Sequence, residues 1–228
     1  MKPLSEYTAL EMARRCALIL LAFSIIFSAL LAGAHQLTKE TIAKNIQAER
    51  LKIIQNLLPD DSYNNDLLHD FLTLPPKKEL GQRKKSQLLF ARNNGVVTAF
   101  LLEAIPPDGY GGNIRLMIAI DAKGHLMGAE VLEHHETPGL GDYVAKKKWL
   151  QQFKNNKNKH FRIQKDGGDI LYRAGATISA RAVTNAISRA VEFVAHHRRD
   201  FLQARNHHDH HFPFKTEHFK KDENRATD

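Results

Sequence analysis

The stretch RAGATISARAV, residues 173–183, stands directly before the longest amphipathic pattern in the polar part of the chain. The apolar positions that follow have helical spacing: Val183, Ile187, Ala190, Val191 and Val194. Thr177 and Ser179 are both suitable N-cap residues, so the stretch predicts the start of a long helix. Amide groups at a helix N-terminus favour a phosphate, Gly175 permits close backbone approach, and two arginines add positive charge. The stretch is therefore either an ordinary capped junction or an anion site.

The preceding part of the chain has the pattern of an antiparallel sheet. Residues 86–91 and 96–105 flank Asn93-Asn94-Gly95, which is a strong signal for a hairpin turn. Residues 113–121 and 126–133 flank a second turn and predict a second hairpin. The pattern after this four-stranded sheet predicts three further elements: a helix over residues 143–153, a short strand over 161–164, and the final long helix. We therefore predict an α+β fold in which helices flank a sheet with one apolar face.

Residues 16–34, CALILLAFSIIFSALLAGA, contain no charged residue and are long enough to span a bilayer core. A cleaved signal peptide is the alternative, since Ala32-Gly33-Ala34 resembles a cleavage site. We favour a retained transmembrane helix, because the apolar run is longer than a signal core and continues into a helical pattern that Pro59 ends. Basic residues before the run favour a cytoplasmic N-terminus, although further lysines after it blur the rule.

The predicted organisation has five parts. They are a cytoplasmic N-terminus (residues 1–15), the transmembrane helix (16–34), a stalk helix and linker (35–85), a compact domain (86–200) and a polar tail (201–228). Within the linker we expect a loop with one short helix near residues 67–72. The tail holds five of the thirteen histidines, a composition that can bind divalent metal. Because no carboxylate or cysteine framework fixes a geometry there, we interpret it as a solvated, disordered tail.

Composition and motifs argue against several classes of function. The net charge is +8, but Lys and Arg are spread along the chain without a nucleic-acid-binding signature, so no nucleic-acid partner is expected. The single cysteine, Cys16, gives no intrachain disulfide and no cysteine-bound cluster. Neither a Walker A sequence nor a dinucleotide fingerprint occurs, and Gly175-Ala176-Thr177 is not a hydrolase nucleophile elbow. His134 and His135 are adjacent and would point to opposite faces of a strand, so no metal site is predicted.

Two loops are candidates for a binding site, Glu136–Gly141 and Ala174–Thr177, because each follows a sheet element and precedes a helix. The first loop offers backbone groups to a flat polar heterocycle, while Pro138 and Leu140 can pack on its face. The loops belong to a wider set of motifs: Pro107-Asp108-Gly109-Tyr110, residues 133–142, Lys165-Asp166-Gly167-Gly168, and Gly175-Ala176-Thr177 followed by Arg181-Ala182-Val183. This set resembles the G subunit of the Rnf/Rsx ion-translocating electron-transport complex. It is similar, more distantly, to the C subunit of the sodium-translocating NADH:quinone reductase.

The resemblance implies a periplasmic FMN-binding domain on a single helix in the bacterial inner membrane. It implies FMN joined covalently, through a phosphoester, to Thr177 by a separate flavin transferase. The other cofactor-binding residues would come from the same two loops and the start of the last helix: Gly175, Ala176, Ile178, Ser179, Glu136, Thr137, Pro138, Gly139, Leu140 and Gly141. The chain would then be a non-autonomous electron-transfer subunit of a translocase complex. Its partners would be the other membrane subunits, which would hold the ion path.

Two positions depart from the family pattern that the transferase reads. Ala174 stands where the family usually has Ser or Thr, and Leu171 stands where it usually has Asp. These departures leave one alternative open, and a second alternative stands independently of them. One is a flavin-free assembly subunit of the same complex, and the other is a free-standing periplasmic flavoprotein.

Overall fold

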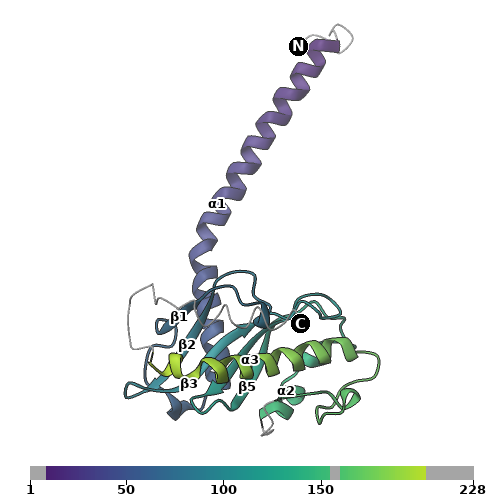
Figure 1. Cartoon of the computed structure of the whole chain (residues 1–228). Coiled ribbons are helices and arrows are strands. Elements are labelled where there is room, and N and C mark those ends of the chain that lie inside the picture. Colours follow the sequence, from purple (N-terminus) through teal and green to yellow (C-terminus); the bar gives the residue numbers. More distant parts are fainter. Residues whose placement is uncertain (1–8, 155–159, 204–228) are drawn as a thin grey trace, which may run out of the picture. The chain divides into compact units, whose positions relative to one another are not determined.

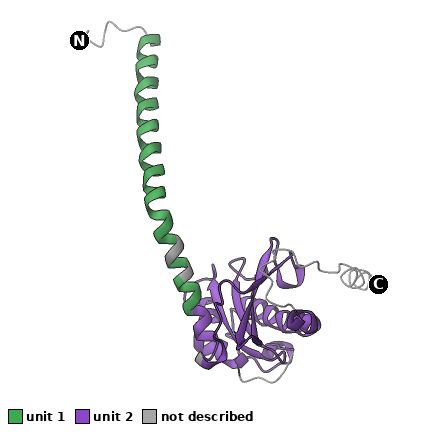
Figure 2. Cartoon of the chain, turned by 90° about the vertical axis from the view of Figure 1, so that its left-hand side faces the viewer, with its two compact units in different colours: residues 1–52 green, residues 53–228 purple. Residues whose placement is uncertain are grey.

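The computed structural model describes residues 9–154 and 160–203. The chain divides into two compact units, residues 1–52 and residues 53–228 (Figure 2). The helices and strands follow one another along the chain in the order α1 (Ala9–Leu57), β1 (Phe71–Leu74), β2 (Ser86–Asn93), β3 (Val96–Ala104), β4 (Arg115–Asp121), β5 (Leu126–Glu133), α2 (Lys147–Lys154) and α3 (Thr177–Gln203). Figure 1 labels most of them. Short 3₁₀ turns occupy Asp60–Ser62, Lys78–Leu80, Asp142–Ala145 and Gln164–Asp166. The predicted α+β fold is confirmed.

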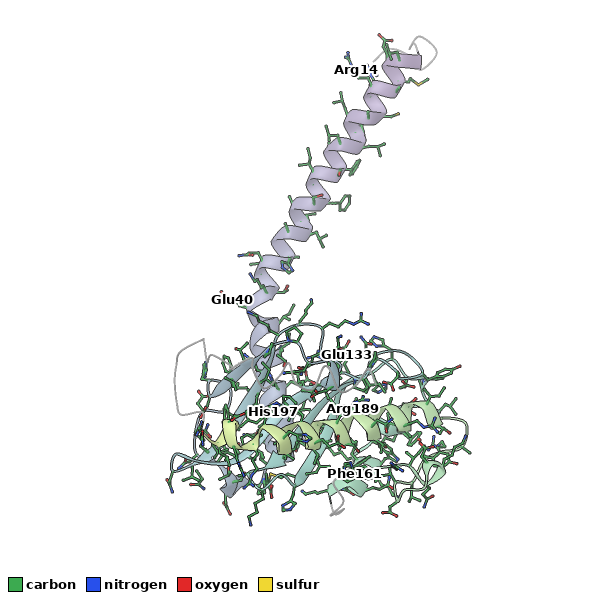
Figure 3. The ribbon with its side chains drawn as sticks, in the orientation of Figure 1. Arg14, Glu40, Glu133, Phe161, Arg189 and His197 are labelled. Atoms are coloured by element: carbon green, nitrogen blue, oxygen red, sulfur yellow. The ribbon has the colours of Figure 1, made fainter. Side chains whose placement is uncertain are left out.

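Helix α1 carries the long apolar stretch of the first unit. Over Leu10–Ile42 it is long and apolar enough to cross a membrane, with a mean hydropathy of 2.5 and no part of its apolar window buried. Figure 3 shows its side chains, from Arg14 to Glu40, projecting outward around the helix. Among the described helices it alone meets these criteria, so the described part of the chain has one candidate membrane span. The helix ends at Leu57, in line with the stop expected at Pro59.

The five strands form one antiparallel sheet in the order β1-β2-β3-β4-β5. The turn between β2 and β3 is Asn94-Gly95, whose φ angles of 51° and 81° are both positive, as a type I′ turn requires. β4 and β5 form the second hairpin, in which Ile118 lies opposite Ala129. Both hairpins predicted from the sequence are therefore confirmed.

The short helix expected near residues 67–72 is absent from the structure, which has turns there followed by strand β1. β1 runs antiparallel to β2 and places Phe71 opposite Leu89. An ion pair between Asp70 and Arg92 (Oδ2···Nε 2.8 Å) holds the chain just before β1 against β2. A strand of four residues is too short to show a clear period in the sequence, so its pairing with β2 decides its structure.

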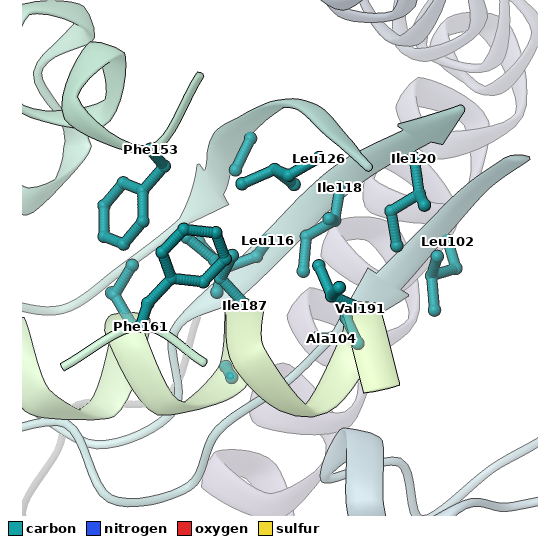
Figure 4. Close-up of a cluster of buried hydrophobic side chains, with 14 of the residues drawn as sticks. Leu102, Ala104, Leu116, Ile118, Ile120, Leu126, Phe153, Phe161, Ile187 and Val191 are labelled. Carbon is teal, nitrogen blue, oxygen red and sulfur yellow. The ribbon is translucent and has the colours of Figure 1, made fainter. Parts of the chain in front are cut away.

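Both faces of the sheet are covered, whereas the sequence suggested one apolar face. On one face, Leu102 of β3 and Ile118 of β4 belong to a large core with Ile187 of α3 (Figure 4). On the other face, Leu101 and Met117 belong to a second core with the C-terminal end of α1. Because neighbouring strand residues point to opposite faces, the nearly continuous apolar runs of β3 and β4 supply both cores.

The helix expected over residues 143–153 is divided in the structure. Lys146 is extended, with a ψ of 130°, and separates the 3₁₀ turn Asp142–Ala145 from α2. The turn directs the hydroxyl of Tyr143 to the backbone before α3, whereas α2 packs against β5. The expected helix is thus divided because its first half contacts the segment before α3 and its second half packs against β5.

The segment that leads into α3 also differs from the prediction. The strand expected over residues 161–164 is reduced to a single parallel bridge between Ile163 and Ile170. Helix α3 continues to Gln203, so the first residues of the predicted tail are helical. The rest of that tail, with its histidines, lies outside the described residues.

Candidate functional site

The structure brings the two candidate loops together at the N-terminus of α3. The guanidinium of Arg173 donates a hydrogen bond to the carbonyl oxygen of Gly139 (Nη1···O 2.8 Å). The side chain of Leu140 lies beside Gly175, 3.7 Å from the position that a Cβ would take there. Gly175 itself has a φ of 87°, a backbone conformation that favours glycine. The two loops are therefore in direct contact.

Glu136 is the buried centre of this arrangement, with 4% of its surface exposed. Its Oε2 accepts a hydrogen bond from Ser179 Oγ (2.5 Å), and its Oε1 accepts one from the amide of Gly111 (3.2 Å). A Cβ at Gly141 would lie 2.6 Å from Oε2, so glycine is the residue that fits at this position. One carboxylate thus fastens the loop after β5 to α3 and to the glycine-rich loop between β3 and β4.

The two hydroxyls near the start of α3 have different surroundings. Ser179 is fully buried, and its hydroxyl is bonded to Glu136. Thr177 is the first residue of α3 and is half-buried, and its hydroxyl forms no hydrogen bond with any part of the chain that the structure describes. The Thr177 Oγ1 is therefore the hydroxyl that remains available to a ligand.

The two arginines of the stretch do not contribute equally to the charge at this site. Arg181 forms a two-point ion pair with Asp166 (Nε···Oδ2 and Nη2···Oδ1, both 2.7 Å). This hydrogen-bonded pair lowers the pKa of the Asp166 carboxyl and raises that of the Arg181 guanidinium. Arg173 lies over the ring of Tyr143 and forms no ion pair with a described residue. The positive charge beside the helix N-terminus is thus that of Arg173.

Exposed hydrophobic side chains collect in the segments that build the site. The described part of the second unit exposes six large hydrophobic residues, and four of them belong to these segments. We call these four the apolar rim: Tyr110, Leu140, Leu171 and Ile178. Leu140 and Ile178 lie in the loop after β5 and in the first turn of α3, with 41% and 49% of their surface exposed. Large exposed apolar groups beside a polar anchor are typical of a surface that binds a ligand or partner.

Sequence reasoning missed three side chains that contact the backbone before Thr177. They are Tyr143, Trp149 and Gln152, from the 3₁₀ turn and from α2. Burial raises the pKa of the Tyr143 phenol, so the hydroxyl stays protonated and can donate a hydrogen bond. No local pattern connects these residues with a loop some twenty to thirty positions later, and only the fold brings them together.

The remaining predicted positions are divided between the interior and the surface. Thr137, Pro138 and Gly139 are exposed, whereas Ala176 is buried beneath the start of α3. His134 follows β5 and accepts a hydrogen bond from the amide of Glu136 (N···Nδ1 3.3 Å). Within residues 9–154 and 160–203, no group of three His, Cys, Asp or Glu side chains is arranged to hold a metal ion.

Known protein families match the segments that build this site. A family model for the RnfG N-terminal region matches residues 1–57, and a model for the FMN-binding domain matches residues 109–192. The second range contains both candidate loops and Thr177. A solved structure, that of NqrC from Shewanella oneidensis, is similar over 57% of this chain and 68% of that chain, with a TM-score of 0.43 and 23% identity.

Curated relatives extend over most of the chain. The G subunit of the ion-translocating oxidoreductase complex of Aliivibrio fischeri is 34% identical over 194 residues, which cover 82% of this chain and 92% of that protein. The corresponding G subunits of Haemophilus influenzae and Shewanella oneidensis are 37% and 35% identical, over 75% and 81% of this chain and 86% and 91% of their own lengths. The resemblance noted from the motifs is thus confirmed, and the chain belongs to the family of G subunits of ion-translocating oxidoreductase complexes.

Proposed function

We propose that this chain is an electron-transfer subunit of a membrane-bound complex that couples electron transfer to ion translocation, and that it carries FMN on Thr177. The observation that carries the proposal is the state of the Thr177 hydroxyl. It is half-exposed and without a hydrogen bond among the described residues, and it stands at the first residue of α3 inside the segment that matches the FMN-binding domain. Its neighbour Ser179 is buried and already bonded.

The residues around Thr177 fit a phosphate ester of a flavin. The first amides of α3 have no partner within the helix and favour a negative group at its N-terminus. Arg173 adds a positive charge that no described carboxylate neutralises, whereas Asp166 compensates Arg181. A phosphodiester at Thr177 would keep one negative charge in this position.

The attachment requires an activated donor and a separate enzyme. A bond forms between Thr177 Oγ1 and the FMN phosphorus, while the anhydride bond of a flavin dinucleotide breaks. The threonine proton and the departing nucleotide phosphate leave together, so atoms and charge balance. Since no described basic side chain is bonded to the Thr177 hydroxyl, the chain lacks the usual means of activating it. A flavin transferase would supply that activation.

The apolar rim offers a seat for the flavin ring. Leu140 presents apolar surface on the loop after β5, and Ile178 presents it in the first turn of α3, while the backbone of residues 137–141 offers polar groups to the edge of the ring. The buried side chain of Glu136 holds this loop in place through its hydrogen bonds to Ser179 and to the amide of Gly111. The bound flavin would supply the electron chemistry, and the protein would supply position and electrostatics.

We further propose that α1 anchors the second unit at the periplasmic side of the bacterial inner membrane. Residues 16–34 carry no charged side chain, so an ion path through this span alone is unsupported. The other membrane subunits of the Rnf/Rsx complex would then hold the ion path and exchange electrons with this chain.

The decisive experiment is co-expression with a flavin transferase, followed by intact-mass measurement and in-gel flavin fluorescence. We expect the wild-type mass to rise by one FMN less one water, and Thr177→Val to remain unshifted and dark. Thr73→Val is the matched control, because it removes an exposed threonine hydroxyl of the second unit that lies outside the two loops. A fluorescent T177V protein would refute the attachment residue. If the wild-type mass stays unshifted while a related G subunit is labelled in the same assay, the flavin-free assembly subunit would be favoured. Leu171 and Ala174 are the reason for considering that alternative.

A further inference from the structure

The loop that leads to Thr177 is held by its backbone. Gln152 Oε1 accepts a hydrogen bond from the amide of Leu171 (2.7 Å), and Trp149 Nε1 donates one to the carbonyl oxygen of Leu171 (2.6 Å). The Tyr143 hydroxyl accepts a hydrogen bond from the amide of Arg173 (3.0 Å) and donates one to the carbonyl oxygen of Ala176 (3.3 Å). Four backbone groups of one short loop are thus bonded to three side chains.

Three side chains of the same loop are exposed to solvent. Leu171 has 56% of its surface exposed, and Arg173 and Ala174 are exposed as well. Leu171 and Ala174 are the two positions that depart from the family pattern. Their side chains are not needed for the hydrogen bonds that hold the loop, because those bonds go to backbone atoms.

Two of the three holding side chains, Tyr143 and Trp149, belong to the buried core, and Gln152 is half-buried on the same helix as Trp149. Trp149 stands edge-to-face against Tyr143 and Phe153, with ring centroids 5.6 Å and 5.2 Å apart. Phe153 stands edge-to-face against Phe161 at 5.5 Å, and Figure 4 shows these two rings among the buried side chains next to α3. Gln152 Nε2 also donates a hydrogen bond to the carbonyl oxygen of Trp149 (3.0 Å), which orients its amide. The loop is therefore fastened to a packed aromatic cluster.

From this geometry we infer that Tyr143, Trp149 and Gln152 are positioning residues for the modification of Thr177. They hold the loop backbone in the conformation that presents the Thr177 hydroxyl, whatever side chains stand at positions 171 and 174. The inference rests on the proposed attachment of FMN to Thr177. It accounts for how this chain can present Thr177 to a transferase although it departs from the family pattern at Leu171 and Ala174.

The test measures the single-turnover rate at which a purified flavin transferase labels the full-length chain. Tyr143→Phe removes two hydrogen bonds and keeps the ring, and Gln152→Met removes the acceptor for the Leu171 amide. We expect both to label about tenfold more slowly, the effect of roughly two ordinary hydrogen bonds on a barrier. Gln152→Glu keeps an oxygen acceptor for the Leu171 amide but loses the donor to the carbonyl oxygen of Trp149, so it should label at a rate between those of Q152M and the wild type. The matched control is Gln151→Met, on an exposed neighbouring residue of α2.

A second measurement separates positioning from general loss of stability. Hydrogen exchange at the amides of Leu171 and Arg173 should accelerate in Q152M and Y143F respectively, at temperatures where the thermal transition shows both variants folded. Wild-type exchange and wild-type labelling in these variants would overturn the inference. A wild-type chain that is never labelled would instead overturn the proposed attachment, and the exchange rates would still decide whether the side chains hold the loop.

Discussion

At the scale of single residues, the site depends on which polar side chains have partners. Glu136 and Ser179 bind each other in the interior, and Asp166 holds Arg181 at the surface. Thr177, with no described partner, is the exception. Residue type alone does not distinguish the hydroxyls of Thr177 and Ser179, because either can cap a helix. Burial and hydrogen bonding in the folded chain distinguish the two hydroxyls.

Replacing Glu136 tests its role as the fastening point of three segments. Glu136→Ala removes the acceptor used by the Ser179 hydroxyl and the Gly111 amide inside the protein. We expect it to lower the free energy of unfolding by about 2–4 kcal/mol, and Glu136→Gln, which keeps an oxygen acceptor, by about 1 kcal/mol. Urea unfolding followed by circular dichroism measures both. Equal losses for the two variants would contradict this role.

The Asp166–Arg181 pair makes stability depend on pH. The pKa of Asp166 is lower in the folded protein than in the unfolded chain, because Arg181 binds the ionised form. The pair therefore stabilises the protein above the unfolded-state pKa of about 3.9, and this contribution is lost as the pH falls through the folded-state pKa. We expect Asp166→Asn to melt below wild type at neutral pH, with a difference that shrinks below about pH 4.

Melting temperatures between about pH 3 and pH 7 check this expectation. Asp108→Asn is the control, because Asp108 is an exposed aspartate of the same unit for which no ion pair is present among the described residues. A D166N difference that stays constant across this pH range would show that the ion pair is not its cause.

At the scale of elements, the strands of the sheet have two buried faces. Leu101 and Leu102 are neighbours on β3, and both are almost completely buried, although they point to opposite sides of the sheet. The end of α1 covers the face of Leu101, and the helices that follow the sheet cover the face of Leu102. The last turn of α1, from Ile53 to its end, is therefore a structural part of the second unit.

Truncating these two leucines separately tests the second core. We expect Leu101→Ala and Leu102→Ala each to lower the free energy of unfolding by about 2–5 kcal/mol, since each leaves a cavity in a packed core. Thermal or urea unfolding measures the two side by side. A sheet with only one covered face would make L101A nearly neutral, and that result would contradict the second core.

At the scale of the whole molecule, the described part of the chain combines one candidate membrane span with a unit that carries the candidate site. Relatives matched over 86–92% of their own lengths are G subunits of ion-translocating oxidoreductase complexes. In our proposal the span keeps the flavin near the other membrane subunits, and the covalent link keeps it on the protein. The T177V experiment tests the link.

The sequence by itself determined the features that depend on a few neighbouring positions. The two hairpins, the apolar span and a long helix that starts near Thr177 follow from turn residues, hydropathy and helical spacing. The predicted capping by Thr177 or Ser179 was wrong, because the Ser179 hydroxyl is bonded to Glu136 and the Thr177 hydroxyl has no hydrogen bond among the described residues. The two candidate loops, which the structure brings into contact, were also recognisable, because their motifs are short and continuous. These signals act locally, and therefore they can be read without a fold.

Only the tertiary structure decided the features that join distant positions. β1 forms because β2 pairs with it, and the second core forms because the C-terminal end of α1 packs against one face of the sheet. Glu136 meets Ser179 across 43 positions, and Tyr143 meets Arg173 across 30. Such contacts depend on strand register and packing, which no short window of sequence contains. The Thr177 hydroxyl is available because its neighbours bind one another, and that is a property of the folded chain.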